Sequence, residues 1–313
     1  MCIKSAEGSA PVLGTTLDIA GSFMNHSCNP TAFVFFEGRQ MRVRTLRPLR
    51  AGEEITQSYV ELSSSIFLRK KIIENDYFFK CLCLRCEDEM KELQEKALHD
   101  TQWLVKLENA QQRLLELANS AVGHYNQTGI HMELGKLEED AKNIICEPFP
   151  NGVWPNGMPP LASVHRTFAK ICKSNNNVPG ALRYSFKDSL TQQDRVGGLW
   201  VHSLFDIIQI ISLTVILPDQ HLIFKENNLF SKDDCWNVLH GYLGELKRAA
   251  TLTFGSDSIY TRSIADWYSK AMLSVDPPRP GTRSFKAVYG LSQKKLLKWA
   301  GIEESRGIDI FVM

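Results

Sequence analysis

The stretch Asn25-His26-Ser27-Cys28-Asn29-Pro30 is the part of this 313-residue sequence that decides the fold. It presents an amide, an imidazole and a thiol within four residues. Alone, an adjacent Asn-His pair is more often a turn or a satisfied polar pair than a ligand site. Two later segments give the stretch its meaning: residues 52–59, Gly-Glu-Glu-Ile-Thr-Gln-Ser-Tyr, and a cysteine cluster at residues 81–86.

The cysteine cluster has the pattern Cys81-x-Cys83-x-x-Cys86, which lets a tight loop surround one metal ion. A structural zinc site needs four ligands, so one must come from elsewhere. In a reducing compartment such a cluster indicates a metal site first, with free buried cysteines or redox chemistry as the alternatives. Spacing alone does not choose the fourth ligand among Cys28, the other isolated cysteines (2, 146, 172 and 235) and a histidine such as His99.

Residues 11–60 have the pattern of strands and loops. Two β-prone runs, residues 32–36 and 41–46, are separated by a glycine-containing segment, which predicts a hairpin. We expect another short extended piece at residues 53–56 and a helix over residues 63–74.

Beyond the cysteine cluster the pattern becomes helical, with apolar residues recurring on one helix face. A proline- and glycine-rich segment at residues 147–160 predicts a loop between helical groups. Stacked helical hairpins like tetratricopeptide repeats are expected, although the sequence has no self-similar 34-residue repeat. The predicted apolar helix faces consist of three sets of residues: Leu104, Leu107, Leu114 and Ala118; Trp236, Leu239, Leu243, Leu246 and Ala250; and Tyr260, Ile264, Trp267 and Ala271.

The composition supports two domains with buried cores, since 43% of the residues are hydrophobic and 23% are charged. The net charge of +1 gives no argument for nucleic acid or an anionic membrane as a partner. The first eight residues lack the apolar core of a secretory signal, so we expect an intracellular protein. The most apolar stretch, residues 199–217, contains His202, Asp206 and Gln209, which argues against a membrane span.

In this order and spacing, the three segments resemble the SET-domain lysine methyltransferases, and specifically the SET-and-MYND group. The resemblance covers residues 12–88 by motif. It implies an α+β protein with four parts: residues 1–60, the C-terminal half of a β-rich SET domain; 61–88, a post-SET helix and zinc-binding cysteine cluster; 89–275, an all-α domain of helical hairpins; and 276–313, a C-terminal tail.

The same resemblance implies a protein-lysine N-methyltransferase that uses S-adenosylmethionine and zinc. The partner would be a histone or another lysine-containing protein, in the nucleus or cytoplasm, and we expect a monomer. Complete members begin with a glycine-containing cofactor segment and carry a MYND zinc finger. Neither is in this sequence, so we expect the N-terminal SET half and the finger to be missing. A catalytically inactive zinc-stabilised interaction module and a redox or metal sensor remain alternative hypotheses.

Residue roles also follow from the resemblance. A lysine of reference pKa about 10.4 must lose a proton before it attacks, and a narrow apolar channel favours the neutral amine. Without the flanking motifs, Tyr77-Phe78-Phe79 is equally a core-packing aromatic run. The resemblance implies that Asn25 and His26 contact S-adenosylmethionine, Phe79 packs on its adenine, Tyr59 aligns the methyl transfer, Tyr77 lines the lysine channel, and Cys28 joins Cys81, Cys83 and Cys86 as the fourth zinc ligand.

Several charged residues have simpler interpretations. Glu53 and Glu54 are neighbours on an extended piece and so point to opposite faces, which favours structural or backbone-capping roles over acid–base catalysis. His202 and Asp206 are expected to be a satisfied interior pair. Arg42 and Arg44 belong to a basic run with Arg39, Arg47 and Arg50, and alternation predicts that they share a solvated outer strand face, opposite Met41, Val43 and Thr45.

Overall fold

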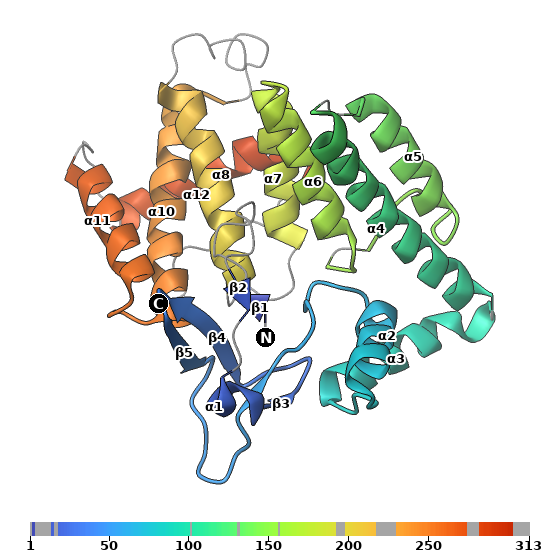
Figure 1. Ribbon diagram of the computed structural model, residues 1–313. Helices are drawn as coiled ribbons and strands as arrows, with labels where there is room; N and C mark the ends of the chain where they lie inside the picture. The colour runs from blue at the N-terminus through green and yellow to red at the C-terminus, as the bar shows by residue number, and fades with distance from the viewer. Residues whose placement is uncertain are drawn as a thin grey trace. The chain divides into compact units, whose positions relative to one another are not determined.

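The computed structural model describes residues 2–3, 14–15, 18–100, 102–129, 132–155, 157–191, 198–216, 230–273 and 282–302 (Figure 1). By their contacts, the described residues up to Ile171 form one compact unit and those from Cys172 onward form a second. All described strands belong to the first unit, and the described elements of the second are helices. The chain is therefore an α+β protein, as predicted.

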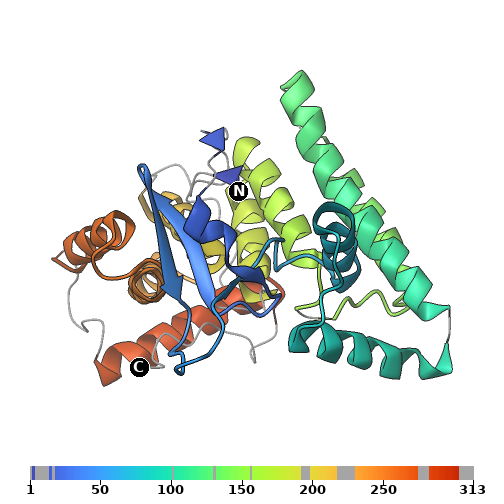
Figure 2. The same cartoon turned by 60° about the horizontal axis from the view of Figure 1, so that its bottom comes forward.

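The predicted hairpin is confirmed. Strand β4, Ala32–Glu37, runs antiparallel to β5, Gln40–Thr45, and Figure 2 shows the two strands side by side. Gly38 begins the two-residue turn with a φ of +58°, a conformation that favours glycine. A second antiparallel pair joins β1, Cys2–Ile3, to β2, Gly14–Thr15.

The prediction of a solvated arginine face on β5 is wrong. Arg42 and Arg44 are only partly exposed, whereas Val43 on the opposite face is 42% exposed. Strand register places Arg42 opposite Phe35, and its Nε binds the buried carboxylate of Glu37 at 2.6 Å. The arginine stems therefore share a face with aromatic side chains, an arrangement that long cationic residues adopt readily.

A short parallel pairing joins two segments that are thirty residues apart in the sequence. Strand β3, Asn25–His26, pairs with β6, Thr56–Gln57, with Asn25 opposite Thr56. Helix α1, Ile19–Ser22, precedes β3, and the Gln57 side chain donates to the Gly21 carbonyl at 2.9 Å. This pairing brings the Asn-His stretch to the segment that ends in Tyr59.

The helix predicted over residues 63–74 is confirmed, displaced by three residues. Helix α2, Ile66–Tyr77, begins at Ser65, whose hydroxyl accepts the Leu68 N–H at 3.3 Å. It ends at Phe78, which has a left-handed backbone with a φ of 61°. The cysteine cluster follows, and Cys83 precedes helix α3, Leu84–Lys96, and the 3₁₀ turn η1, Ala97–His99.

The rest of the first unit is helical. Helices α4, Trp103–Thr128, and α5, Leu134–Cys146, pack against each other, and the predicted α4 face is buried except for the partly exposed Leu104. The predicted loop over residues 147–160 is confirmed in its described part. It leads to α6, Leu161–Ser174.

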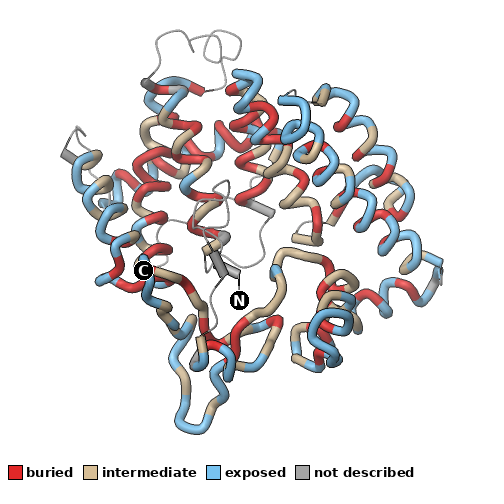
Figure 3. Tube along the Cα trace, in the orientation of Figure 1, coloured by how far each residue is buried: buried red, intermediate tan, exposed pale blue. Residues whose placement is uncertain are grey.

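The second unit is centred on helix α10, which contacts α8, α11 and α12. Figure 3 shows α8 and α10 buried along much of their length. Within the segment expected to be a tail, residues 283–299 form a packed helix in which Phe285 and Leu296 are buried. The helices of the unit are α7, Val178–Thr191; α8, Gly198–Ile216; α10, Lys232–Phe254; α11, Ile259–Leu273; and α12, Arg283–Trp299.

Helix α8 contains most of the sequence's most apolar stretch. None of the helices in the described ranges combines the length and the apolar character needed to cross a bilayer. His202 and Asp206 on this helix are both of intermediate burial, and that they form a satisfied interior pair remains a prediction. The four-part domain division remains a prediction.

Candidate functional site

Four rings from three segments meet next to β3. The His26 ring lies 5.3 Å from the Tyr59 ring and 6.1 Å from Phe79, measured between centroids. The Tyr59 ring lies 4.8 Å from Tyr77 and contacts Phe79 edge-on at 6.5 Å. The fold therefore gathers four of the five residues expected at the cofactor and the lysine, and we call these four rings the aromatic cluster.

Hydrogen bonds fix the orientation of Tyr59. Its backbone N–H donates to His26 Nδ1 at 3.0 Å, and its hydroxyl donates to the Met24 carbonyl at 2.6 Å. Burial, with the nearby Tyr77, raises the pKa of the Tyr59 phenol. The phenol therefore stays protonated at neutral pH, which suits positioning and polarisation rather than service as a base.

His26 connects the aromatic cluster to the cysteines. Burial and, to a smaller extent, the charge of Arg69 lower the pKa of His26 to about 4, so the ring is neutral at pH 7. Because Nδ1 accepts the Tyr59 N–H, the ring proton lies on Nε2. Nε2 lies 3.3 Å from Cys28 Sγ, so its N–H faces the sulfur.

Asn25 is exposed beside the cluster, and its amide nitrogen donates to Glu54 Oε1 at 2.6 Å. The neighbouring Glu53 accepts the Arg50 backbone N–H at 3.1 Å and pairs with Arg47. These contacts agree with the structural and capping roles expected of the two glutamates.

Two threonines stabilise the place where the segments that contain β3 and β6 come together. The Thr31 N–H donates to Thr56 Oγ1 at 3.1 Å, and the Thr56 N–H donates to Thr31 Oγ1 at 2.8 Å. The Thr31 hydroxyl also donates to the Glu54 carbonyl at 3.1 Å. Both threonines are buried, so each satisfies a backbone N–H that water cannot reach.

The end of α2 presents three aromatic residues to the surface. Tyr77 is 43% exposed, Phe78 87% and Phe79 38%, so they are not a core-packing run. The left-handed turn at Phe78 allows Phe79 to return toward His26. Tyr77 and Phe79 thus offer open ring faces beside Tyr59, on which a planar or cationic ligand could pack.

Four cysteine sulfurs lie close together, and that of Cys28 lies next to His26 of the aromatic cluster. The Sγ atoms of Cys28, Cys81, Cys83 and Cys86 all lie within 4.8 Å of one another. From here on, the term cysteine cluster includes Cys28. Cys86 Sγ lies 3.5 Å from Cys28 Sγ and 3.9 Å from Cys81 Sγ. Of the candidate fourth cysteines whose side chains the structure describes, Cys28 joins the group, and Cys2 lies outside that described set. The side chain of His99 lies outside the described residues.

Burial and hydrogen bonding favour the neutral thiol at Cys81 and Cys86. The hydrogen bond with Cys28, followed by burial, raises the pKa of Cys86, and burial raises that of Cys81. Only Cys83 is partly exposed, since Cys28, Cys81 and Cys86 are 0%, 7% and 1% accessible. A cation bound among the sulfurs would reverse this preference and favour thiolates.

Two arginines that share one glutamate interact with Cys28 of the cysteine cluster. Arg69 of α2 is fully buried and pairs with Glu89 of α3, and Arg85 Nε donates to the same carboxylate at 2.7 Å. Arg85 also donates to the Cys28 carbonyl at 3.0 Å. Burial lowers the pKa of Arg69, but Glu89 and Cys28 outweigh it and the net shift is upward.

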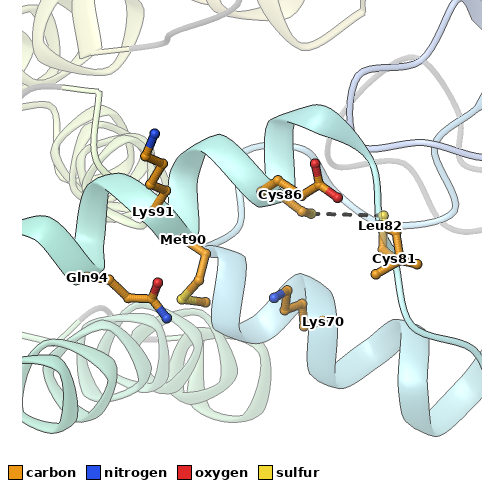
Figure 4. Close-up of a pocket in the computed structure, with 8 residues that line it drawn as sticks. Lys70, Cys81, Leu82, Cys86, Met90, Lys91 and Gln94 are labelled. Atoms are coloured by element: carbon orange, nitrogen blue, oxygen red, sulfur yellow. Dashed lines mark hydrogen bonds between the residues drawn. The ribbon is translucent and has the colours of Figure 1, made fainter.

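A pocket of about 250 Å³ lies between α2 and α3, next to Cys81 and Cys86 (Figure 4). Its lining includes none of the aromatic cluster. Figure 4 shows Lys70, Met90, Lys91 and Gln94 around it, with Cys81 and Cys86 at one end.

Sequence comparisons place these features in a family. Residues 2–60 match the SET domain. SET domain and MYND-type zinc finger protein 6 of Schizosaccharomyces pombe is 28% identical over 142 residues, 42% of this chain and 29% of that protein. Histone-lysine N-methyltransferase SMYD3 of Mus musculus is 34% identical over 80 residues, 26% and 19% of the two chains. Histone-lysine N-methyltransferase ASHR1 of Arabidopsis thaliana is 39% identical over 67 residues, 21% and 14%.

Residues 2–60, which contain the strands and the Asn-His crossing, thus match a SET domain. The relatives that the chain resembles include SET-and-MYND proteins, in agreement with the resemblance of the three motifs. The chain spans less than a third of the length of these curated relatives.

Sequence reasoning missed the polar residues that support the site. Arg69 carried a signal, because it lies with Ile66 and Ile73 on the buried face of α2, where a cation needs a partner. Arg85 carried another, since it lies inside the cysteine motif. The hydrogen bond from Asn25 to Glu54 and the two hydrogen bonds between Thr31 and Thr56 join distant segments. No local sequence pattern predicts them.

Replacing Thr56 with valine tests whether its hydrogen bonds with Thr31 stabilise the fold. The substitution keeps the shape but removes the acceptor of the buried Thr31 N–H, so we expect a loss of about 2 kcal/mol in unfolding free energy. Urea denaturation followed by circular dichroism measures it. Thr45→Val, at an exposed position of β5, should change stability by less than about 0.5 kcal/mol. Equal losses in the two variants would contradict the role given to Thr56.

Proposed function

We propose that this chain is part of a protein-lysine N-methyltransferase that uses S-adenosylmethionine and carries one structural zinc ion. The observation that supports this most strongly is the position of His26, which contacts Tyr59 of the aromatic cluster and Cys28 of the cysteine cluster. We further propose a histone or another lysine-containing protein as substrate and the nucleus or cytoplasm as location. The relatives named as histone-lysine methyltransferases support this class of substrate.

In this proposal the aromatic cluster forms the cofactor and lysine site. S-adenosylmethionine would supply an activated methyl group. Asn25 and His26 would contact the cofactor from β3, and Phe79 would pack on its adenine. The exposed ring of Phe79 and the exposed amide of Asn25, both beside His26, fit this use.

Tyr59 and Tyr77 would act on the lysine side. Tyr59 is fixed by its bonds to Met24 and His26, so its phenol can orient the reacting groups without losing its proton. Tyr77 lies 4.8 Å from the Tyr59 ring and would wall the channel that receives the lysine. Aromatic walls exclude water, which favours the neutral amine, and they also accept a methylammonium cation.

The cysteine cluster fits zinc by its dimensions. A tetrahedral site with zinc–sulfur bonds of about 2.3 Å places its sulfurs about 3.8 Å apart. The separations of 3.5 and 3.9 Å from Cys86 Sγ are close to this value. We propose Cys28, Cys81, Cys83 and Cys86 as the ligands, which would join the segment after β3 to the start of α3.

The alternative is a catalytically inactive interaction module stabilised by zinc. It is favoured by exposed apolar side chains near the cysteines: Phe78 at 87%, Leu82 at 77% and Leu84 at 73%. The two functions differ in whether the chain binds S-adenosylmethionine.

Calorimetric titration with S-adenosylmethionine separates them. We expect saturable binding by the wild-type chain and at least tenfold weaker binding, about 1.4 kcal/mol, in Asn25→Ala and Phe79→Ala. Tyr125→Ala is the matched control, because Tyr125 is 41% exposed on α4 and lies outside the aromatic cluster. No heat of binding from the folded wild-type chain would favour the interaction module instead.

Metal analysis tests the zinc ligands. We expect about one zinc ion per chain by mass spectrometry of the purified protein, and a clear reduction in Cys28→Ser because a hydroxyl replaces a thiolate ligand. Cys146→Ser changes a thiol outside the cysteine cluster and should leave the content unchanged. If Cys28→Ser retains the wild-type content, Cys28 is not a ligand.

A further inference from the structure

The side-chain amide of Asn25 is held by one carboxylate. Asn25 Nδ2 donates to Glu54 Oε1 at 2.6 Å, although the two residues are 29 positions apart in the sequence and both are exposed. An ionised carboxylate accepts hydrogen bonds and donates none, so the nitrogen of the amide, and not its oxygen, must face Glu54. Hydrogen bonds to charged acceptors are stronger than those between neutral groups. Glu54 therefore fixes the orientation of the Asn25 amide.

The backbone that carries these two side chains is fixed as well. Asn25 lies in β3, opposite Thr56 of β6. The Glu54 carbonyl accepts the Thr31 hydroxyl at 3.1 Å, and Thr31 Oγ1 accepts the Thr56 N–H at 2.8 Å. Both threonines are buried. The hydrogen bond between Asn25 and Glu54 thus forms between side chains on an ordered backbone, so little further entropy is lost in making it.

The hydrogen bond leaves the oxygen of the Asn25 amide for a ligand. Within the part of the chain that the structure describes, Asn25 Oδ1 has no hydrogen-bond partner. The oxygen and the nitrogen of an amide point in different directions from the same carbon, so Oδ1 is directed away from Glu54. It can accept a hydrogen bond from an N–H group. S-adenosylmethionine has such groups in its ammonium and in the amine of its adenine.

We propose that Glu54 is a positioning residue for the cofactor, which orients the Asn25 amide so that its oxygen faces S-adenosylmethionine. This role rests on the cofactor site of the proposed function, and it adds a residue that acts through Asn25 without touching the cofactor. Without Glu54 the amide is free to turn over and present its own N–H groups to a donor. A side chain that is oriented before binding raises affinity, because the cost of ordering it has already been met.

Two substitutions separate the reach of Glu54 from its charge. Glu54→Gln keeps the length of the side chain and an oxygen that accepts the Asn25 N–H, but it removes the charge. Glu54→Asp keeps the charge but is shorter by one carbon–carbon bond of about 1.5 Å, which takes the carboxylate out of hydrogen-bond distance. Glu53→Ala is the matched control, because this neighbouring carboxylate accepts the Arg50 N–H and pairs with Arg47 instead.

Calorimetric titration of the full chain with S-adenosylmethionine measures the effect on affinity. We expect Glu54→Ala and Glu54→Asp to bind about tenfold more weakly than the wild type, as for the loss of one oriented hydrogen bond. Glu54→Gln should stay within about twofold of the wild type, and Glu53→Ala should match it. The melting temperature of each variant is measured alongside, so that a change in folding is separated from a change in binding.

A spectroscopic signature reports the orientation of Asn25 without the cofactor. Its side-chain amide signals in a ¹H–¹⁵N spectrum are assigned by their loss in Asn25→Ala. One of the two protons should lie downfield, because it is bonded to a charged acceptor. Glu54→Ala should return this proton to the position of an exposed asparagine, and Glu53→Ala should leave it in place.

Three outcomes are decisive. If the wild-type chain does not bind S-adenosylmethionine, the proposed function is wrong and this role of Glu54 falls with it. If the wild type binds and Glu54→Asp binds equally well, or Glu54→Gln binds as weakly as Glu54→Ala, the inference alone is overturned. If Glu54→Ala does not fold, the comparison of Glu54→Gln with Glu54→Asp decides: binding retained in the first and weakened in the second supports the inference, and any other pattern overturns it.

Discussion

The neutral ring of His26 is the feature on which the rest of the site depends. One nitrogen accepts the Tyr59 N–H, and the other faces the Cys28 sulfur. Because a neutral imidazole has one donor and one acceptor, both contacts are satisfied only when the chain crosses as it does, with β3 beside β6. The residues proposed to orient a substrate and those proposed to hold a metal are thereby joined through one side chain.

Helix α2 is a second connection between the aromatic cluster and the cysteine cluster. Arg69 lies on its buried face beside Cys28, and Tyr77 at its end contacts Tyr59. A shift of this helix would move Tyr77 and Arg69 together. Metal binding, in this account, stabilises the aromatic cluster without contributing an atom to it, which is how structural metals commonly contribute folding energy.

Local patterns predicted much of this structure. The hairpin followed from two β-prone runs on either side of a segment that contains Gly38, and α4 followed from apolar spacing. What the sequence did not reveal depended on contacts between distant segments. Glu37 draws Arg42 toward the covered strand face, against the expectation of a solvated arginine surface. Arg69 lies on the buried face of α2, and its partner Glu89 comes from a different helix, α3. Neither partner could be identified from spacing alone.

Amide hydrogen exchange before and after chelation of zinc tests the connection through His26 most directly. The account predicts that the amides of Ser27 and Tyr59, which donate to Gln57 and His26, lose protection together with residues 81–86. Leu114 in the buried face of α4 serves as the internal reference and should remain protected. Loss of protection confined to residues 81–86, with Ser27 and Tyr59 unchanged, would contradict it.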